Sequence, residues 1–208
     1  MSVTSTYIPT RTARDPFRYP RNLASPIIPR LYRRHELALV SIEPSTPWPT
    51  STVAAIALSV SVDRRELIGT PWIDATPVTI LSPRLAEMSR ELSSMRRRFR
   101  IAEPDDSQLK LIDTPLGILP KHLNPPAGSL VILDGLKPCT CRALLAHGCA
   151  VLAFSPLGPR SWRDANMWFW LSQNGKTPIL ETFGNGRDEG YCKIMLAAPH
   201  FWRNSVLA

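Results

Sequence analysis

Apolar and polar positions follow one another along the chain in blocks that predict alternating strands and helices. Short, almost wholly apolar blocks predict buried strands over 36–43, 129–134 and 149–155. A strand that is covered on both faces shows such a run, because neither of its faces meets water. Two shorter blocks, within 71–81 and over 109–113, predict further strands of the same sheet.

Apolar residues spaced three and four apart predict the helices between these strands. The clearest helix covers 83–98, and the residues of its apolar face are Leu85, Met88, Leu92, Met95 and Phe99. A turn rich in serine and threonine, suited to capping, opens a helix over 50–67. Two shorter helices are predicted over 138–146 and 161–172.

The end of the chain predicts a hairpin, because 178–183 and 191–197 flank a glycine-rich connection. Strands that alternate with helices indicate a mostly parallel sheet covered on both faces. The expected fold is therefore α/β, a three-layer, mostly parallel, doubly wound sheet with a C-terminal hairpin and an extended N-terminal arm. In such folds ligands lie beyond the carboxyl ends of the strands.

The positive charge of the chain is concentrated in its first residues. The net charge is +8, and residues 1–34 hold seven arginines and one acid, which gives +6. The same segment holds five of the 21 prolines, which favours an extended conformation. We therefore expect a basic arm over 1–34 and an α/β domain over 35–208. The arginines of the arm are Arg11, Arg14, Arg18, Arg21, Arg30, Arg33 and Arg34.

Three interpretations of the arm remain open: a tail that becomes ordered on a protein partner, a contact to nucleic-acid phosphates, and an organelle transit peptide. A second basic cluster ends the 83–98 helix, at Arg96, Arg97, Arg98 and Arg100; it is either a solvated helix end or part of the same nucleic-acid surface. Within 167–171 bulky apolar residues would surround the predicted helix, so that Trp168 and Trp170 are candidate partner contacts.

The cysteines do not suggest a disulfide framework, because the chain is long enough to fold without one and no export signal is evident. The longest apolar run, 53–62, is about half of a membrane span. We therefore expect a cytoplasmic protein without a membrane span. One group of metal-ligating residue types is a candidate zinc site, although a helix between its halves would hold them apart; it comprises Cys139, Cys141, His147 and Cys149.

Several motifs, taken in order, resemble those of the MinD/ParA-type P-loop ATPases, and the resemblance covers roughly 36–198. The segment 40–58 resembles the strand, phosphate loop and Ala-rich helix of that family, with Ser51 and Thr52 at the end of the loop motif. Two later segments resemble strands of the family: 73–77 is like the second-strand motif D-A-x-P, and 131–134 is like the Walker B strand. Residues 155–156 with 161–165 resemble a later strand and the helix that opens with S-x-R-D-A. Asn185 would lie near the asparagine that helps to bind the base.

The phosphate loop itself departs from the family pattern. Ser45 and Thr50 stand where the family has lysines, and Thr46, Pro47 and Pro49 stand where it has glycines. Proline offers no N–H to a phosphate, and the lysine charge that assists phosphoryl transfer is missing. The degenerate nucleotide-binding positions implied by the resemblance are Ser45, Thr46, Thr50, Ser51, Thr52, Asp74, Asp134 and Asn185.

The resemblance, with its departures, implies a non-catalytic pseudo-ATPase. It would be a scaffold or adaptor in a partition, conjugation, secretion or other positioning assembly, bound to another protein subunit such as an intact ATPase of the same fold. No catalytic residue, metal or cofactor is expected, apart from weak residual nucleotide binding. Two alternatives stay open: a basic nucleic-acid-associated protein that uses the arm and the arginine-rich helix end, and a degenerate methyltransferase-like fold or other unrecognised enzyme.

Overall fold

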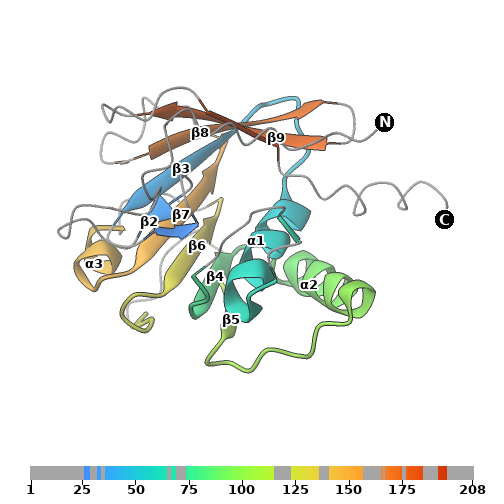
Figure 1. The fold of residues 1–208 in the computed structure, drawn as a ribbon, viewed down its shortest axis with the longest axis vertical. Coiled ribbons are helices and arrows are strands. Elements are labelled where there is room, and N and C mark those ends of the chain that lie inside the picture. Colours follow the sequence, from blue (N-terminus) through green and yellow to red (C-terminus); the bar gives the residue numbers. More distant parts are fainter. Residues whose placement is uncertain are drawn as a thin grey trace, which may run out of the picture.

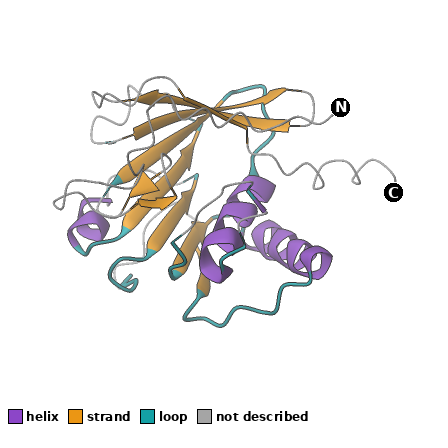
Figure 2. Ribbon diagram, viewed as in Figure 1, coloured by secondary structure: helices purple, strands orange, loops and turns teal. Residues whose placement is uncertain are grey.

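The computed structural model describes residues 26–28, 32–33, 36–64, 67–68, 74–114, 123–135, 141–156, 165, 167–174, 177–184 and 192–195. Figure 1 shows a sheet with helices on both of its faces, and Figure 2 separates the elements by type. In the described part of the chain, no helix is long and apolar enough to cross a membrane.

The large sheet has eight strands in the order β10-β9-β8-β3-β7-β6-β4-β5. Six neighbouring strands, from β8 to β5, are parallel, which confirms the predicted mostly parallel α/β sheet. Their bounds are β3 Leu37–Ile42, β4 Val78–Ser82, β5 Leu109–Asp113, β6 Leu130–Asp134, β7 Ala150–Ser155 and β8 Met167–Asn174. The strands β9, Thr177–Gly184, and β10, Cys192–Met195, pair antiparallel and form the predicted C-terminal hairpin.

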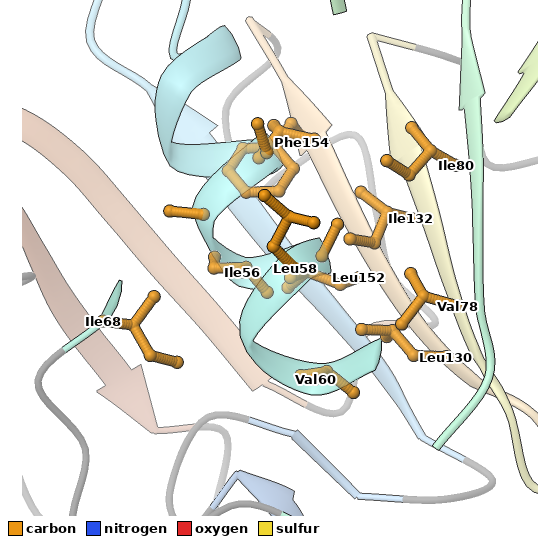
Figure 3. Close-up of a cluster of buried hydrophobic side chains, with 14 of the residues drawn as sticks. Ile56, Leu58, Val60, Ile68, Val78, Ile80, Leu130, Ile132, Leu152 and Phe154 are labelled. Carbon is orange, nitrogen blue, oxygen red and sulfur yellow. The ribbon is translucent and has the colours of Figure 1, made fainter. Parts of the chain in front are cut away.

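Side chains alternate between the two faces of the sheet and build two separate cores. Ile80, Ile132 and Phe154 are buried beneath α1, Thr50–Val62, and α2, Leu85–Phe99. Leu39, Leu133 and Val151 are buried on the opposite face, with α3, Cys141–Ala146. Figure 3 shows the first core, where side chains of α1 interleave with those of β4, β6 and β7. The three layers are thus two helices, the sheet and one helix.

The two long helices differ in how much of their surface they bury. α1 is buried on nearly all sides, because its small and β-branched residues lie between the sheet and α2. α2 follows the predicted amphipathic pattern and buries only Met88, Leu92 and Met95. α1 ends at Val62, five residues before the predicted end, because Asp63 adopts the left-handed conformation that closes a helix.

The predicted helix over 161–172 is wrong for 167–172, which belongs to β8. β8 pairs with β3 on one side and with β9 on the other. A run of bulky apolar residues suits a strand buried in a sheet as well as a helix, and the pairing partners decide between them. Phe169 and Leu171 point into the core beneath α1 and α2, whereas Trp170 is half-buried.

Most of the N-terminal arm lies outside the described residues. Two short strands within it, β1 Pro26–Ile28 and β2 Tyr32–Arg33, pair antiparallel. β2 lies beside β3 and β7, as Figure 1 shows. The last part of the predicted arm therefore approaches the α/β domain.

Candidate functional site

The site lies at the carboxyl edge of the sheet, where β4 and β6 end side by side. Leu81 is paired with Leu133 in the parallel register, so the next residues, Ser82 and Asp134, are neighbours. Both side chains point to the face that carries α1 and α2, because they continue the series of Ile80 and Ile132. This is the edge at which open α/β sheets bind ligands.

Asp134 is completely buried, and its carboxylate accepts hydrogen bonds from three side chains of this chain. Ser82 Oγ donates to Oδ2 at 2.6 Å, and Trp48 Nε1 donates to Oδ1 at 2.6 Å. Arg84 Nη2 lies 2.5 Å from the same Oδ1 and forms a salt bridge. A buried carboxylate requires such partners, because its desolvation is otherwise very unfavourable. Both oxygens of Asp134 are therefore occupied by internal donors.

Arg84 and Trp48 also contact each other directly. The guanidinium carbon of Arg84 lies 4.1 Å from the centre of the Trp48 ring, in a cation–π stack. Arg84 stands at the start of α2, where its N–H donates to Ser82 Oγ. Trp48 is half-buried and lies in the loop between β3 and α1. The loop between β3 and α1 thus closes over Asp134 through the indole ring of Trp48, together with Arg84 at the start of α2.

Gly135 makes this closure sterically feasible. Its φ is +78°, and a Cβ at this position would lie 3.2 Å from Cζ2 of Trp48 and 3.5 Å from Nη2 of Arg84. A left-handed backbone is unfavourable for an L-residue by about 1–2 kcal/mol. Glycine after Asp134 therefore avoids both the backbone strain and the close contact with the indole.

We expect Gly135→Ala to destabilise the protein by about 2 kcal/mol, because it adds backbone strain and displaces the Trp48 ring. Urea unfolding followed by circular dichroism measures the loss. Gly148→Ala is the matched control, since Gly148 has a φ of +88° but follows α3 at the opposite edge of the sheet. If the two variants lose the same stability, the contact to Trp48 contributes nothing.

The side-chain hydroxyls at the start of α1 donate hydrogen bonds to carboxylates of the neighbouring helix, α2. Thr50 Oγ1 donates to Glu87 Oε1 at 2.5 Å, and Ser51 Oγ donates to Glu91 Oε1 at 2.8 Å. Pro49 precedes the helix in a tight turn in which the Thr50 N–H donates to the Trp48 carbonyl at 2.9 Å. The first turn of α1 contains no acid of its own, so the two glutamates of α2 supply the negative charge that a helix N-terminus favours.

The hydrogen bonds of Thr50 and Ser51 to glutamates disfavour phosphate binding at the start of α1. In a phosphate loop, the N-terminus of the following helix and its hydroxyl residue face the phosphates and their metal. Here the hydroxyls of Thr50 and Ser51 donate to carboxylates, which repel a phosphate. The residues present therefore do not fit a metal-bound nucleotide, since Asp134 is likewise fully engaged.

The structure brings together only some of the predicted nucleotide positions. Thr50 and Ser51 lie at the site, as does Asp134. Ser45 is exposed and Thr46 half-buried in the loop, while Thr52 is buried within α1. Asn185 lies outside the described residues.

Asp74 was expected at the carboxyl end of a strand, and this placement is wrong. It precedes β4, and the N–H of nearby Thr76 donates to the carbonyl of Val60 near the end of α1. The Thr76 hydroxyl also donates to the carbonyl of Gly128, just before β6. Asp74 therefore lies at the amino edge of the sheet, opposite the site.

The basic and aromatic candidates that the structure describes lie on α2, β2 and β8. Arg97, Arg98 and Arg100 are exposed at the end of α2, and Arg96 forms a salt bridge of 3.0 Å with Glu103. Arg33 lies in β2 and Trp168 in β8, although the positions of their side chains are not described. The other arginines of the arm, Arg11, Arg14, Arg18, Arg21, Arg30 and Arg34, lie outside the described residues.

The residues of the candidate zinc site do not form a cluster in the described part of the chain, where no group of three or more metal-ligating side chains occurs. Cys141 and Cys149 are buried thiols at the two ends of the α3 segment, His147 is exposed, and Cys139 is not described. Burial raises the pKa of the Cys149 thiol, and its contact with Ser129 opposes this only in part. Such a thiol is a small core residue rather than a ready metal ligand.

Sequence reasoning missed five residues of the site: Trp48, Ser82, Arg84, Glu87 and Glu91. One local signal was present, since a tryptophan between two prolines is unusual in a loop that faces phosphate. The other four lie in a strand end and a helix, where their residue types are ordinary. Their roles follow only from the packing of α2 against α1 and the sheet.

Comparison with family models and curated proteins gives no function for this chain. No protein-family model matches this chain, and no curated protein matches its sequence. The closed arrangement around Asp134 is therefore the observation on which a function must rest.

Proposed function

We propose that this protein is a non-catalytic α/β scaffold or adaptor whose nucleotide-site position is closed by its own side chains. The observation that carries the proposal is the Asp134 carboxylate, which is fully buried and bonded to Trp48, Ser82 and Arg84. An acidic residue that holds a metal or activates water must be able to contact it. Asp134 instead holds the ends of β4, β6 and the loop together.

The start of α1 supports the same proposal independently. Glu87 and Glu91 accept hydrogen bonds from Thr50 and Ser51, so the helix N-terminus already has negative partners. A γ-phosphate would have to displace two carboxylates and compete without the help of a lysine. The role that remains for such a fold is to bind another protein, as the resemblance to positioning ATPases implies.

Isothermal titration calorimetry with ATP and Mg²⁺ tests the proposal directly. We expect no binding up to about 1 mM nucleotide, which corresponds to a standard binding free energy weaker than about −4 kcal/mol. Phosphate release measured in parallel should equal that of buffer. Binding in the micromolar range, or hydrolysis that disappears in Asp134→Ala, would overturn the pseudo-ATPase proposal.

A double variant distinguishes two reasons for a lack of nucleotide binding: carboxylates that block the loop, and a loop without phosphate-binding groups. Glu87→Gln with Glu91→Gln removes both carboxylates from the start of α1 while keeping the side-chain size. If the loop lacks phosphate-binding groups altogether, this variant also fails to bind nucleotide. The matched control is Glu103→Gln, which removes an exposed carboxylate that pairs with Arg96 away from the loop.

A further inference from the structure

The outer face of α2 carries a groove that begins at the site and extends along the helix beyond it. One hollow, of about 800 Å³, lies between the start of α2 and the end of β5, with Leu85, Arg90, Leu111 and Asp113 in its walls. A second, of about 460 Å³, continues along the helix to Arg97. The two share Glu87, Ser89 and Arg90, so they form one groove, here called the α2 groove. From Arg84 to Arg97 it is about 20 Å long at 1.5 Å per residue.

Small side chains alternate with charged ones along the α2 groove. Ala86, Ser89 and Ser94 are exposed along it, and Ser93 is half-exposed. Leu85 stands at one end and is the exposed large hydrophobic residue of the described chain, with 36% of its surface accessible. Small residues allow another backbone to approach closely, and an exposed leucine offers an apolar anchor. The shape suits a rod such as a helix.

Two arginines of the groove, Arg90 and Arg97, have no acidic partner among the residues that the structure describes. Arg90 donates only to the carbonyl of Ala86 in its own helix, and among the described residues neither Arg90 nor Arg97 has a carboxylate within salt-bridge distance. Glu87 and Glu91 keep their charges, but their carboxylates are held by the hydroxyls of α1 and not by these arginines. Arg90 and Arg97 are two turns apart, about 10.5 Å along the axis.

We propose that the α2 groove binds an acidic amphipathic helix of a partner protein. A helix of about 13 residues matches its length, and acidic residues seven positions apart match Arg90 and Arg97. An apolar residue of the partner would pack on Leu85 and Leu111 at the other end. This inference deepens the proposed scaffold function, on which it rests, by giving the surface and the chemistry of the partner.

The charge pattern of the groove favours a protein over a nucleic acid. Glu87, Glu91 and Asp113 line the same groove as the two arginines, so a uniform row of phosphates would meet repulsion. No aromatic side chain is among the residues that line it, whereas single-stranded nucleic acids are commonly held by stacking. A protein helix can place acids only where the arginines lie.

Fluorescence anisotropy with a defined peptide tests the inference. The probe is a labelled, Ala-rich helical peptide of 18 residues with two glutamates seven positions apart and a leucine near each end. We expect the full chain to bind it, and Arg90→Glu with Arg97→Glu to weaken binding at least tenfold. Arg98→Glu is the matched control, since Arg98 lies in the same helix turn as Arg97 but outside the groove; it should change binding less than threefold.

A charge exchange makes the test specific to these contacts. A peptide with both glutamates replaced by lysine should bind the wild-type chain at least tenfold more weakly, and it should bind the Arg90→Glu, Arg97→Glu variant better than the original peptide does. Failure of this exchange, or an affinity unchanged by the double variant, would refute the docking site.

Two other occupants would also overturn the inference. A 20-nucleotide oligo-dT that binds more tightly than the peptide and loses affinity in the same double variant would make the groove a phosphate-binding surface. A dimer detected by light scattering and dissociated by the double variant would make a second copy the occupant. Neither result bears on the calorimetry with ATP and Mg²⁺, so failure here is distinguishable from failure of the proposed function.

Discussion

Replacing Arg84 with methionine should lower the free energy of unfolding by about 3 kcal/mol. The change leaves the buried Asp134 carboxylate without its cation, and removing one partner of a buried ion pair typically costs about 3–5 kcal/mol. The lower end applies because Trp48 and Ser82 still donate to the carboxylate. Methionine keeps much of the arginine side-chain volume, so the loss reports mainly on the charge.

A double-mutant cycle with Asp134→Asn assigns this loss to the pair. Asparagine keeps the acceptor oxygen for Trp48 but replaces the oxygen that accepts from Ser82 with an NH2 group and removes the charge, and we expect it to cost about 1–2 kcal/mol by itself. In the double variant the losses should fall short of additivity by about 1–2 kcal/mol, as for residues in direct contact. Urea unfolding of the four proteins provides the values. Additive losses would show that Arg84 and Asp134 do not stabilise each other.

Phe169→Ala should destabilise the protein by about 3–5 kcal/mol, the usual range for a buried phenylalanine. Phe169 lies in β8, with 1% of its surface accessible, in the core beneath α1 and α2. Removing the ring leaves a cavity between the sheet and α1 that the surrounding strands cannot close. Chemical denaturation followed by far-ultraviolet circular dichroism measures the effect.

The neighbouring residue provides the matched control. Trp170→Ala removes a larger side chain from the same strand, but Trp170 is only half-buried. We therefore expect it to cost less than Phe169→Ala, by at least 1 kcal/mol. If the tryptophan variant is the less stable of the two, or both variants lose little, the strand does not bury its residues as the structure shows.

The local pattern of the sequence was sufficient for most of the sheet. The strands β3, β6 and β7 are buried throughout and almost wholly apolar because helices cover both of their faces, and this composition is visible without a structure. The spacing of Met88, Leu92 and Met95 likewise predicted α2 from its own periodicity. The C-terminal hairpin followed from its glycine-rich connection. These features depend on residues that are close in the chain.

The element 167–174 could not be decided locally. Five bulky residues in succession have neither a helical nor a strand period, so their burial is equally compatible with both. β8 forms because β3 and β9 provide partners on its two sides, and these lie at distant positions in the chain. The error therefore came from the absence of pairing information rather than from a misjudged propensity.

What the sequence determined by itself is the class of fold and the amphipathic helix, since each is encoded in neighbouring residues. Only the tertiary structure decided the site. Trp48 meets Asp134 across 86 positions of the chain, and Arg84 meets it across 50. Whether Asp134 is open to a ligand or closed depends on these contacts, because the desolvation of a buried carboxylate must be offset by donors from whichever segments the fold brings to it.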